Sequence, residues 1–308
     1  MTAKIAITMG DPAGIGPELI ERLLQEQPQW REQVCVIGLR NWVSRLEQSL
    51  GVTVESTGGP EQCTPGHPDV GGAQAALEAM QRAASGCREG RYRAVVTGPI
   101  SKHECRKAGM TQPGQTEFFA EQWGGEPTMA FVAPTLTVSL ATWHVPLMDL
   151  PNWLTPATLE RCVRHTAELM LRLGVSRPRI AVCGLNPHAG EQGQIGREEV
   201  EWINPLIARL QANLARIELS GCHPADTVFY RHVSGEFDAV VALYHDQALA
   251  PVKTVAFHEA VNVTLGLPHV RTSPDHGTAF GIAGKGVARP LSLQRALELA
   301  DRLTRQVV

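Results

Sequence analysis

Residues 5–26 read IAITMGDPAGIGPELIERLLQE, in which a short apolar run, a glycine-rich turn and an amphipathic segment follow one another directly. The apolar run is rich in β-branched residues and predicts a strand. Pro17 lies where the amphipathic segment begins, and proline is common in the first turn of a helix. A strand that turns directly into a helix is the unit from which parallel α/β sheets are built, so we expect this unit to recur along the chain.

The same alternation of apolar runs and helical patterns continues through the rest of the sequence. It predicts an α/β fold with mixed, largely parallel sheets and helices on both faces. Because no repeat, low-complexity tract or flexible linker interrupts it, we expect a single subunit over residues 1–308 with a soft internal boundary. The predicted strands are residues 5–8, 34–37, 94–97, 137–141, 180–183 and 239–243, and the predicted helices are residues 17–26, 73–84, 156–173, 198–214 and 291–303.

Composition excludes several classes of function. With 28 Lys and Arg against 31 Asp and Glu in 308 residues, the net charge of -3 argues against nucleic-acid binding, which favours a strongly basic surface. The seven cysteines are scattered and never spaced as C-x-x-C, which is typical of a reducing compartment. No segment approaches the roughly 20 apolar residues that cross a bilayer, and the amino terminus lacks a signal-peptide pattern. We therefore expect a soluble cytoplasmic protein with no membrane partner.

Three predicted strands each lead to a histidine at or just beyond the carboxyl end. They lead to His144, His188 and His245. Loops at the carboxyl ends of strands converge on one crevice in open α/β sheets, and three imidazoles there suit a divalent ion with positions left for substrate. A single histidine of this kind is more often a hydrogen-bonded structural residue, so the pattern rather than any one member predicts the metal site.

Polar residues between apolar runs predict an anion site downstream of the last histidine. Lys253, Asn262 and Arg271 lie in segments too apolar for a solvated face, and fixed cations suit a phosphate or carboxylate. Upstream, Lys102 ends TGPISK, and PGQTEF places Gln115 and Thr116 at a helix start, where amide groups favour anions. A structural turn explains both upstream segments equally well.

The glycine-rich turn at residues 10–18 matches neither common phosphate-binding fingerprint. Leu19 occupies the third glycine position of G-x-G-x-x-G after Gly14 and Gly16, and no Gly-Lys-Ser/Thr follows as in a P-loop. Taken alone, this segment is best interpreted as a tight turn between a strand and a helix.

Eight segments together resemble the signature blocks of the 4-hydroxythreonine-4-phosphate dehydrogenase family, in the same order. They are GDPAGIGPE (10–18), TGPISK (97–102), PGQTEF (113–118), CGLNPHAGEQGQIGREE (183–199), PADTVF (224–229), YHDQALAPVK (244–253), VNVTLGLP (261–268) and RTSPDHGTAFGIAGKG (271–286). The resemblance implies a two-lobed fold related to isocitrate and isopropylmalate dehydrogenases. It further implies a lobe formed by both termini, a central dimerisation lobe and an active site in the cleft between them.

The resemblance also assigns site residues. It implies a homodimer in which His144, His188 and His245 bind one divalent ion, zinc, magnesium or cobalt, at a site shared between subunits. The substrate-binding residues that it implies are Thr116, Lys253, Asn262 and Arg271, beside Gln115 at a position that is usually histidine in the family. Glutamine can donate a hydrogen bond to phosphate but carries no charge. This departure could weaken phosphate binding or indicate a related substrate.

A loop near the carboxyl terminus resembles the adenosine-binding loop of isopropylmalate dehydrogenases. It implies a dinucleotide bound by His276, Gly277, Thr278 and Gly284. NAD follows from the family. Arg289 stands where the related group commonly has asparagine, and because arginine accommodates a 2'-phosphate, NADP is the alternative.

The implied reaction is NAD-dependent and metal-dependent oxidation of 4-phosphooxy-L-threonine to a 3-keto acid. Decarboxylation to 3-amino-2-oxopropyl phosphate follows, within pyridoxal 5'-phosphate synthesis. Asp246 and Lys102 are the candidates for the catalytic proton acceptor. The alternatives are a sister dehydrogenase acting on 4-phospho-D-threonate or an aromatic dihydrodiol dicarboxylate, a metal-dependent phosphoesterase, and a metabolite-binding protein without activity.

Overall fold

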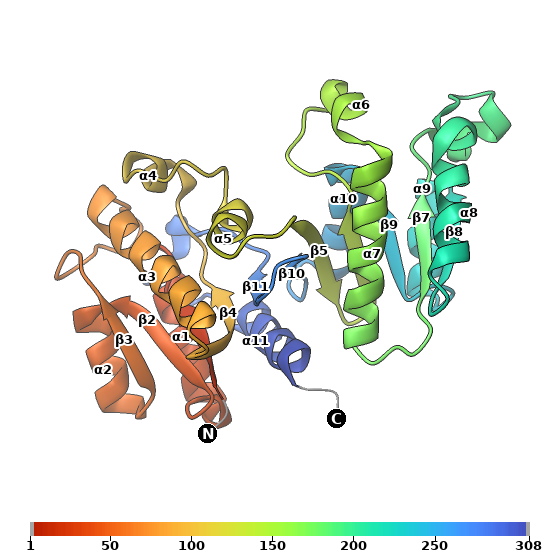
Figure 1. Ribbon diagram of the computed structural model, residues 1–308. Helices are drawn as coiled ribbons and strands as arrows, with labels where there is room; N and C mark the ends of the chain where they lie inside the picture. Colours follow the sequence, from red (N-terminus) through yellow and green to blue (C-terminus); the bar gives the residue numbers. More distant parts are fainter. Residues whose placement is uncertain (1–2, 306–308) are drawn as a thin grey trace. The chain divides into compact units, whose positions relative to one another are not determined.

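The computed structural model describes residues 3–305, and the chain forms two compact units (Figure 1). Unit 1 consists of residues 3–127 and 267–305, so it is built from both ends of the chain. Unit 2 is the continuous segment of residues 128–266.

Unit 1 is built on five parallel strands in the order β3-β2-β1-β4-β11. Ile5, Ala6 and Ile7 are consecutive in β1 and fully buried, so both faces of this strand are covered, as parallel strands require. The strands are β1 (Lys4–Thr8), β2 (Val34–Leu39), β3 (Thr53–Thr57), β4 (Tyr92–Thr97) and β11 (Val270–Pro274). The helices are α1 (Gly16–Glu26), η1 (Pro28–Trp30), α2 (Arg40–Leu50), α3 (Val70–Arg88), α4 (Lys102–Lys107), α5 (Gln115–Trp123), η5 (Phe280–Ile282) and α11 (Leu291–Thr304).

Unit 2 has a mixed sheet in the order β10-β5-β6-β9-β7-β8. β10, β5 and β6 are antiparallel neighbours, whereas β6, β9, β7 and β8 run parallel. The strands are β5 (Thr128–Ala133), β6 (Leu136–Leu140), β7 (Arg179–Cys183), β8 (Glu218–His223), β9 (Ala239–Ala242) and β10 (Val261–Leu265). The helices are η2 (Leu147–Asp149), α6 (Leu150–Trp153), α7 (Pro156–Arg172), η3 (Pro187–Gly193), η4 (Glu199–Ile203), α8 (Asn204–Asn213), α9 (Ala225–Val233) and α10 (His245–Ala256).

Helices cover both faces of the unit 2 sheet. The neighbouring residues Val240 and Val241 of β9 are both fully buried but belong to different apolar clusters. Val240 packs in the cluster that contains residues of α9 and α10, and Val241 packs in the cluster that contains residues of α7 and α8. The alternation of side chains along a strand therefore separates two cores, which confirms the predicted layer arrangement.

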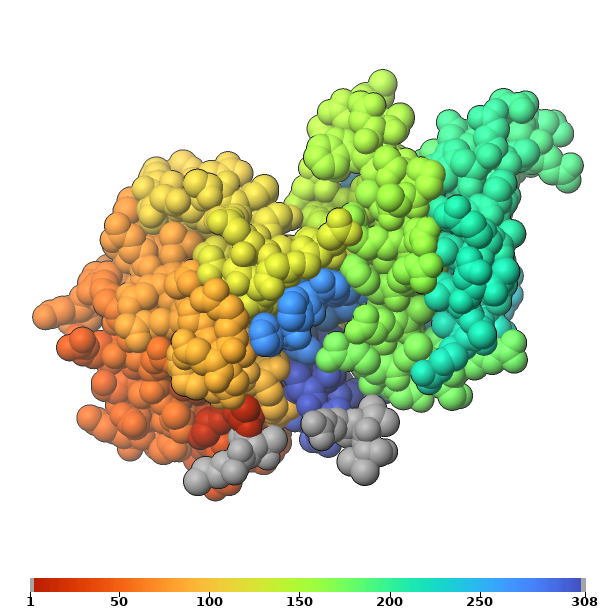
Figure 2. Space-filling model, viewed as in Figure 1, coloured from red at the N-terminus to blue at the C-terminus, as the bar shows by residue number. Residues whose placement is uncertain are grey.

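One predicted helix differs in its first turn. Residues 198–214 were expected to form a single α-helix, but residues 199–203 form a π-helical turn and the α-helix begins at Asn204. Pro205 has no N–H to donate to the carbonyl one turn earlier, which favours a change of helical pattern at this point. The teal segment around residues 190–200, which precedes this helix, projects from the edge of unit 2 (Figure 2).

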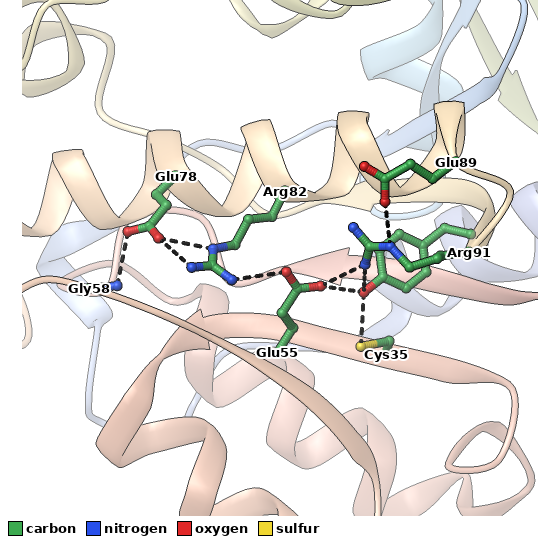
Figure 3. A network of polar contacts seen from close by, with 8 residues as sticks. Cys35, Glu55, Gly58, Glu78, Arg82, Glu89 and Arg91 are labelled. Atoms are coloured by element: carbon green, nitrogen blue, oxygen red, sulfur yellow. Dashed lines mark hydrogen bonds and ion pairs between the residues drawn. The ribbon is translucent and has the colours of Figure 1, made fainter.

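A polar network fastens the edge strand β3 to its neighbours in unit 1 (Figure 3). The Glu55 carboxylate accepts hydrogen bonds from the Tyr92 hydroxyl at 2.6 Å, from Arg82 at 3.0 Å and from Arg91 at 3.1 Å. Partial burial raises the pKa of Glu55, but these three donors together lower it below its usual value. Tyr92 also lies 3.4 Å from the Cys35 sulfur, so the network joins β2, β3, α3 and the start of β4.

Across residues 3–305, no helix is both long enough and apolar enough to span a membrane.

Candidate functional site

Three neighbouring strands of unit 2 end beside the predicted metal histidines. β6, β9 and β7 are adjacent and parallel, so their carboxyl ends lie at one edge of the sheet. The Thr142 hydroxyl donates to the Leu243 carbonyl at 2.7 Å and joins the segments that precede His144 and His245. Buried Gln247 accepts from the Leu243 amide at 2.7 Å and donates to the Gly184 carbonyl at 2.8 Å, which joins the segments that precede His245 and His188.

Two of the three histidines face each other. The ring centres of His144 and His245 are 5.7 Å apart. His245 Nδ1 lies 2.6 Å from Asp246 and His188 Nδ1 lies 2.7 Å from Glu191. The hydrogen bond and the charge of Glu191 raise the pKa of His188. A carboxylate on Nδ1 leaves Nε2 to bind a ligand, which is the usual arrangement around metal-binding histidines.

The chain does not gather the full set of three. Within residues 3–305 there is no group of three or more His, Cys, Asp or Glu side chains placed to hold a metal ion. The two facing imidazoles and the Nδ1–carboxylate contacts fit a divalent ion chemically, and a third donor has to be supplied to complete its coordination.

In unit 1, Arg271 lies in a buried hydrogen-bonded cluster. Its side chain is 3% exposed and donates to the Thr97 hydroxyl from Nε at 3.2 Å and from Nη2 at 2.8 Å. Nη2 also donates to Gln115 Oε1, which accepts from the Thr97 hydroxyl at 2.6 Å. Burial lowers the pKa of Arg271 to about 10, against the opposing charge of Glu117. Arg271 therefore remains a cation at neutral pH, held in a place where an anion would offset its desolvation.

The start of α5 adds hydrogen-bond donors to this cluster, which we call the Arg271 cluster. Gln115 and buried Thr116 are the first two residues of this helix, where backbone N–H groups have no helical acceptor. Gln115 Nε2 donates to the Gly98 carbonyl at 2.9 Å, so the amide orientation is determined on both sides. A Cβ placed on Gly114 would lie 3.9 Å from Lys102 Nζ, so the ammonium of Lys102 is near the same helix start.

The other two predicted substrate residues lie in unit 2. Lys253 is on α10, with its Nζ 5.1 Å from the centre of the Phe257 ring. Asn262 is on β10, paired with Phe131 of β5, and its side-chain oxygen is buried without a hydrogen-bond partner. A buried amide oxygen in this state suits a ligand that brings a donor.

The predicted cofactor loop lies against the glycine-rich turn of residues 10–18. The Ile15 amide donates to the Thr278 carbonyl at 3.0 Å, and the Gly284 amide donates to Glu18 at 2.8 Å. A Cβ on Gly14 would lie 2.9 Å from that Thr278 carbonyl. His276 and Gly277 begin the loop, with His276 Nδ1 3.0 Å from the Gly277 carbonyl. The glycine-rich turn therefore supports the loop through close backbone contact.

A separate cavity of about 1000 Å³ in unit 1 contains none of these residues. Lys4, Gln33 and Arg93 in its lining lie at or beside the amino ends of β1, β2 and β4. The three histidines and Lys102 lie instead beyond the carboxyl ends of strands, where α/β sheets bind ligands.

Sequence reasoning missed four residues that organise these sites. They are Thr97, Glu191, Glu199 and Gln247. All four lie in or at the border of the recognised blocks, which is the signal that could have drawn attention to them. Their partners could not be read from the sequence, because they depend on strand neighbours or on loop conformation.

Comparison with known proteins gives a consistent result. The family model described as "Pyridoxal phosphate biosynthetic protein PdxA" matches residues 21–300. A 4-hydroxythreonine-4-phosphate dehydrogenase from Bradyrhizobium diazoefficiens is 42% identical over 97% of this chain and 96% of its own. The crystal structure of 4-hydroxythreonine-4-phosphate dehydrogenase from Klebsiella pneumoniae is 34% identical with a TM-score of 0.85, and covers 99% of this chain and 100% of that one.

More distant structures define the breadth of the fold. A terephthalate 1,2-cis-dihydrodiol dehydrogenase from Burkholderia xenovorans is 25% identical with a TM-score of 0.72, over 97% of this chain and 98% of that one. An isocitrate dehydrogenase from Methylococcus capsulatus is 15% identical with a TM-score of 0.50, over 98% of this chain and 88% of that one. The latter likeness concerns the fold alone, and it agrees with the expected fold class.

Proposed function

Because the chain belongs to the family of the pyridoxal phosphate biosynthetic protein PdxA, and is an oxidoreductase, we propose that it oxidises 4-phosphooxy-L-threonine with NAD and a divalent metal ion. Oxidation of the C3 hydroxyl yields a 3-keto acid. Its carboxylate leaves as carbon dioxide, which gives 3-amino-2-oxopropyl phosphate. NADP is the alternative cofactor because of Arg289.

The Arg271 cluster is the observation that best supports a phosphorylated substrate. A cation that is 3% exposed, beside the amide groups of a helix start and near Lys102, is suited to a dianionic phosphate. We propose that Arg271, Gln115 and Thr116 hold the phosphate, and that Lys253 and Asn262 contact the remainder of the substrate. Fixing both ends would hold the reacting carbon in one orientation.

When bound, NAD would accept a hydride, and a divalent ion would stabilise negative charge on the substrate oxygen in both steps. Asp246 would hold His245 in the tautomer that presents Nε2, as its 2.6 Å contact with Nδ1 supports. This role engages the Asp246 carboxylate, so we propose Lys102 as the first proton acceptor to test and Asp246 as the second.

We propose a homodimer in which His188 of the partner subunit completes the ligand set begun by His144 and His245. The lack of a three-residue metal-binding group within residues 3–305 of one chain supports this, as does the 63% exposure of the His188 side chain. Unit 2 also exposes large apolar side chains that a partner would cover, among them Met148 at 89% and Trp153 at 59%.

Mixed dimers test the shared site directly. His188→Ala and His245→Ala dimers should each lose metal and turnover. When the two variants are mixed and allowed to exchange subunits, one site of each mixed dimer regains all three histidines, so turnover should return to roughly half per mixed dimer. A site built within one subunit predicts no recovery, because every site would then lack one ligand. A purification tag carried by only one variant allows the mixed dimers to be isolated, which supplies the control for subunit exchange.

The substrate is tested by NADH production from synthetic 4-phosphooxy-L-threonine, with and without a chelator, beside 4-phospho-D-threonate. We expect NADH only from the L-threonine derivative and only without the chelator. Faster turnover of the D-threonate would instead favour the sister dehydrogenase, which Gln115 in place of the usual histidine keeps as the second candidate. A phosphoesterase would release phosphate without saturable binding of NAD.

A further inference from the structure

A run of residues in unit 2 adopts the left-handed conformation. Over residues 188–192 the φ angles are 53°, 52°, 79°, 42° and 57°, and only Gly190 of these residues is a glycine. Left-handed residues other than glycine are disfavoured and usually occur singly. They persist only where the surrounding structure determines them, most often at functional sites. His188 is the first residue of this run, which we call the left-handed turn, and Glu191 is its fourth.

The buried carboxylate of Glu199 binds two residues that precede this turn, Leu185 and Asn186. Glu199 is fully buried, and one of its oxygens accepts from the Leu185 amide at 2.8 Å and from the Asn186 amide at 2.7 Å. Its other oxygen accepts from the Asn186 side chain at 2.9 Å. Three donors converge on one carboxylate, and all three come from the two residues that lead into Pro187 and His188.

Glycines allow the same packing from the other side. A Cβ on Gly190 would lie 2.7 Å from the second Glu199 oxygen, and a Cβ on Gly184 would lie 2.7 Å from the Ala189 Cα. The turn also closes on itself, because the Ala189 amide donates to the Asn186 carbonyl at 3.1 Å. The backbone hydrogen bond, the close contacts at the glycines and the buried carboxylate therefore all favour the left-handed turn.

We propose that Glu199 is a positioning residue that presents the His188–Glu191 pair through the left-handed turn, and so determines the affinity of the metal site. The inference rests on the proposed function, because it takes His188 as a metal ligand. With the turn held, His188 Nδ1 is already 2.7 Å from Glu191, so the imidazole is oriented before the metal arrives.

Two substitutions of Glu199 grade the effect. Glu199→Gln keeps one oxygen for the two backbone amides but places its NH2 against the Asn186 NH2, so the turn is only loosened. Glu199→Ala removes the acceptor of both backbone amides and leaves the Asn186 side chain with Glu198 alone, which accepts from it at 2.7 Å. Glu201→Gln is the matched control, because Glu201 is two residues away and its carboxylate accepts from exposed Arg197 at 2.6 Å.

The measurement is Co²⁺ binding to the metal-free dimer, by calorimetry and by the visible absorption of bound Co²⁺, with amide hydrogen exchange of Leu185 and Asn186 alongside. We expect the Co²⁺ dissociation constant to rise about 10- to 100-fold in Glu199→Ala and by a smaller factor in Glu199→Gln. In Glu201→Gln it should not change. Faster exchange of the two amides should accompany the loss. If Glu199→Ala does not fold, Glu199→Gln decides the question.

A double-mutant cycle separates positioning from general stability. His188→Ala leaves only His144 and His245 to bind Co²⁺ weakly, so affinity in this background is measured at high Co²⁺ concentration. If Glu199 acts through His188, Glu199→Gln will have no further effect on this residual affinity. An equal effect in both backgrounds would overturn the inference, and so would unchanged affinity in both Glu199 variants. Loss of Co²⁺ in His188→Ala with no loss in the Glu199 variants would overturn the inference alone. Failure of the wild-type dimer to bind Co²⁺ would overturn the proposed metal site and the inference together.

Discussion

Replacing Thr97 by valine removes one hydroxyl from the centre of the Arg271 cluster and leaves the shape of the side chain nearly unchanged. That hydroxyl accepts two hydrogen bonds from the buried guanidinium and donates one to Gln115. A hydrogen bond to a charged group contributes about 1.5–3 kcal/mol and a neutral one about 1 kcal/mol. Arg271 cannot escape by losing its proton, because its pKa of about 10 lies well above neutral pH. The two bonds from the guanidinium share one acceptor oxygen, so we count them as one charged bond beside the neutral one, and we expect unit 1 to lose about 3 kcal/mol of unfolding free energy.

Native-state hydrogen exchange of amides in β4 and β11 measures this quantity within unit 1 without requiring the whole chain to unfold in one step. Thr97→Ser is the control, because it keeps the hydroxyl and loses only a buried methyl group, at a cost of about 1 kcal/mol. Inorganic phosphate should stabilise the wild type and Thr97→Ser more than Thr97→Val. The reasoning would be refuted if Thr97→Val and Thr97→Ser differed by less than about 0.5 kcal/mol, the range of an ordinary neutral substitution.

Three other changes have defined outcomes. Glu55→Gln should lower the unfolding free energy by about 1–2 kcal/mol at pH 7. Because the pKa of Glu55 is lowered in the folded protein, the wild type should lose stability as the pH falls below about 4.5, and the variant should lose less, as measured by urea midpoints. Buried His232 accepts from the Thr137 amide at 2.9 Å, and burial lowers the pKa of its imidazole. The wild type should therefore lose stability as the pH falls below about 6.5. In urea titrations, His232→Gln should make the unfolding free energy depend less on pH in this range. Gly14→Ala, whose Cβ would meet the Thr278 carbonyl, should weaken NAD binding about 10-fold in calorimetry, an effect of about 1.4 kcal/mol, while an equal loss of phosphate affinity would contradict a role confined to the cofactor loop.

The strand-turn-helix units could be predicted because their apolar residues follow one period and are closely spaced. β1, β2, β4, β7 and β9 all lie where an unbroken apolar run occurs. β3 and β11 were missed because TVEST and VRTSP contain more polar than apolar residues. α10 was missed because Pro251 interrupts its pattern, although the helix continues through that residue.

The candidate site was predictable where a residue type carries the chemistry, and not where its geometry depends on distant neighbours. Position at strand ends was sufficient to select His144, His188 and His245, and sheet order then placed their strands side by side. Nothing in PHAGEQG indicates that five residues in succession turn left-handed, because local preferences favour this conformation only at the glycines. Glu199 could not be distinguished from its neighbour Glu198 either, because only the structure shows that Glu199 is fully buried and accepts from the Leu185 and Asn186 amides.

The discontinuity of unit 1 has a consequence for how the protein is made. Its strand β11 pairs with β4, so that Val270 lies opposite Ala94, and α11 packs on both strands. On the ribosome, every residue of unit 2 is synthesised before these last elements appear, so unit 2 is able to fold while unit 1 still lacks an edge strand and a covering helix. Premature termination late in the message would therefore leave the apolar surface of β4 open, and quality control would encounter an intact central unit joined to an unfinished one.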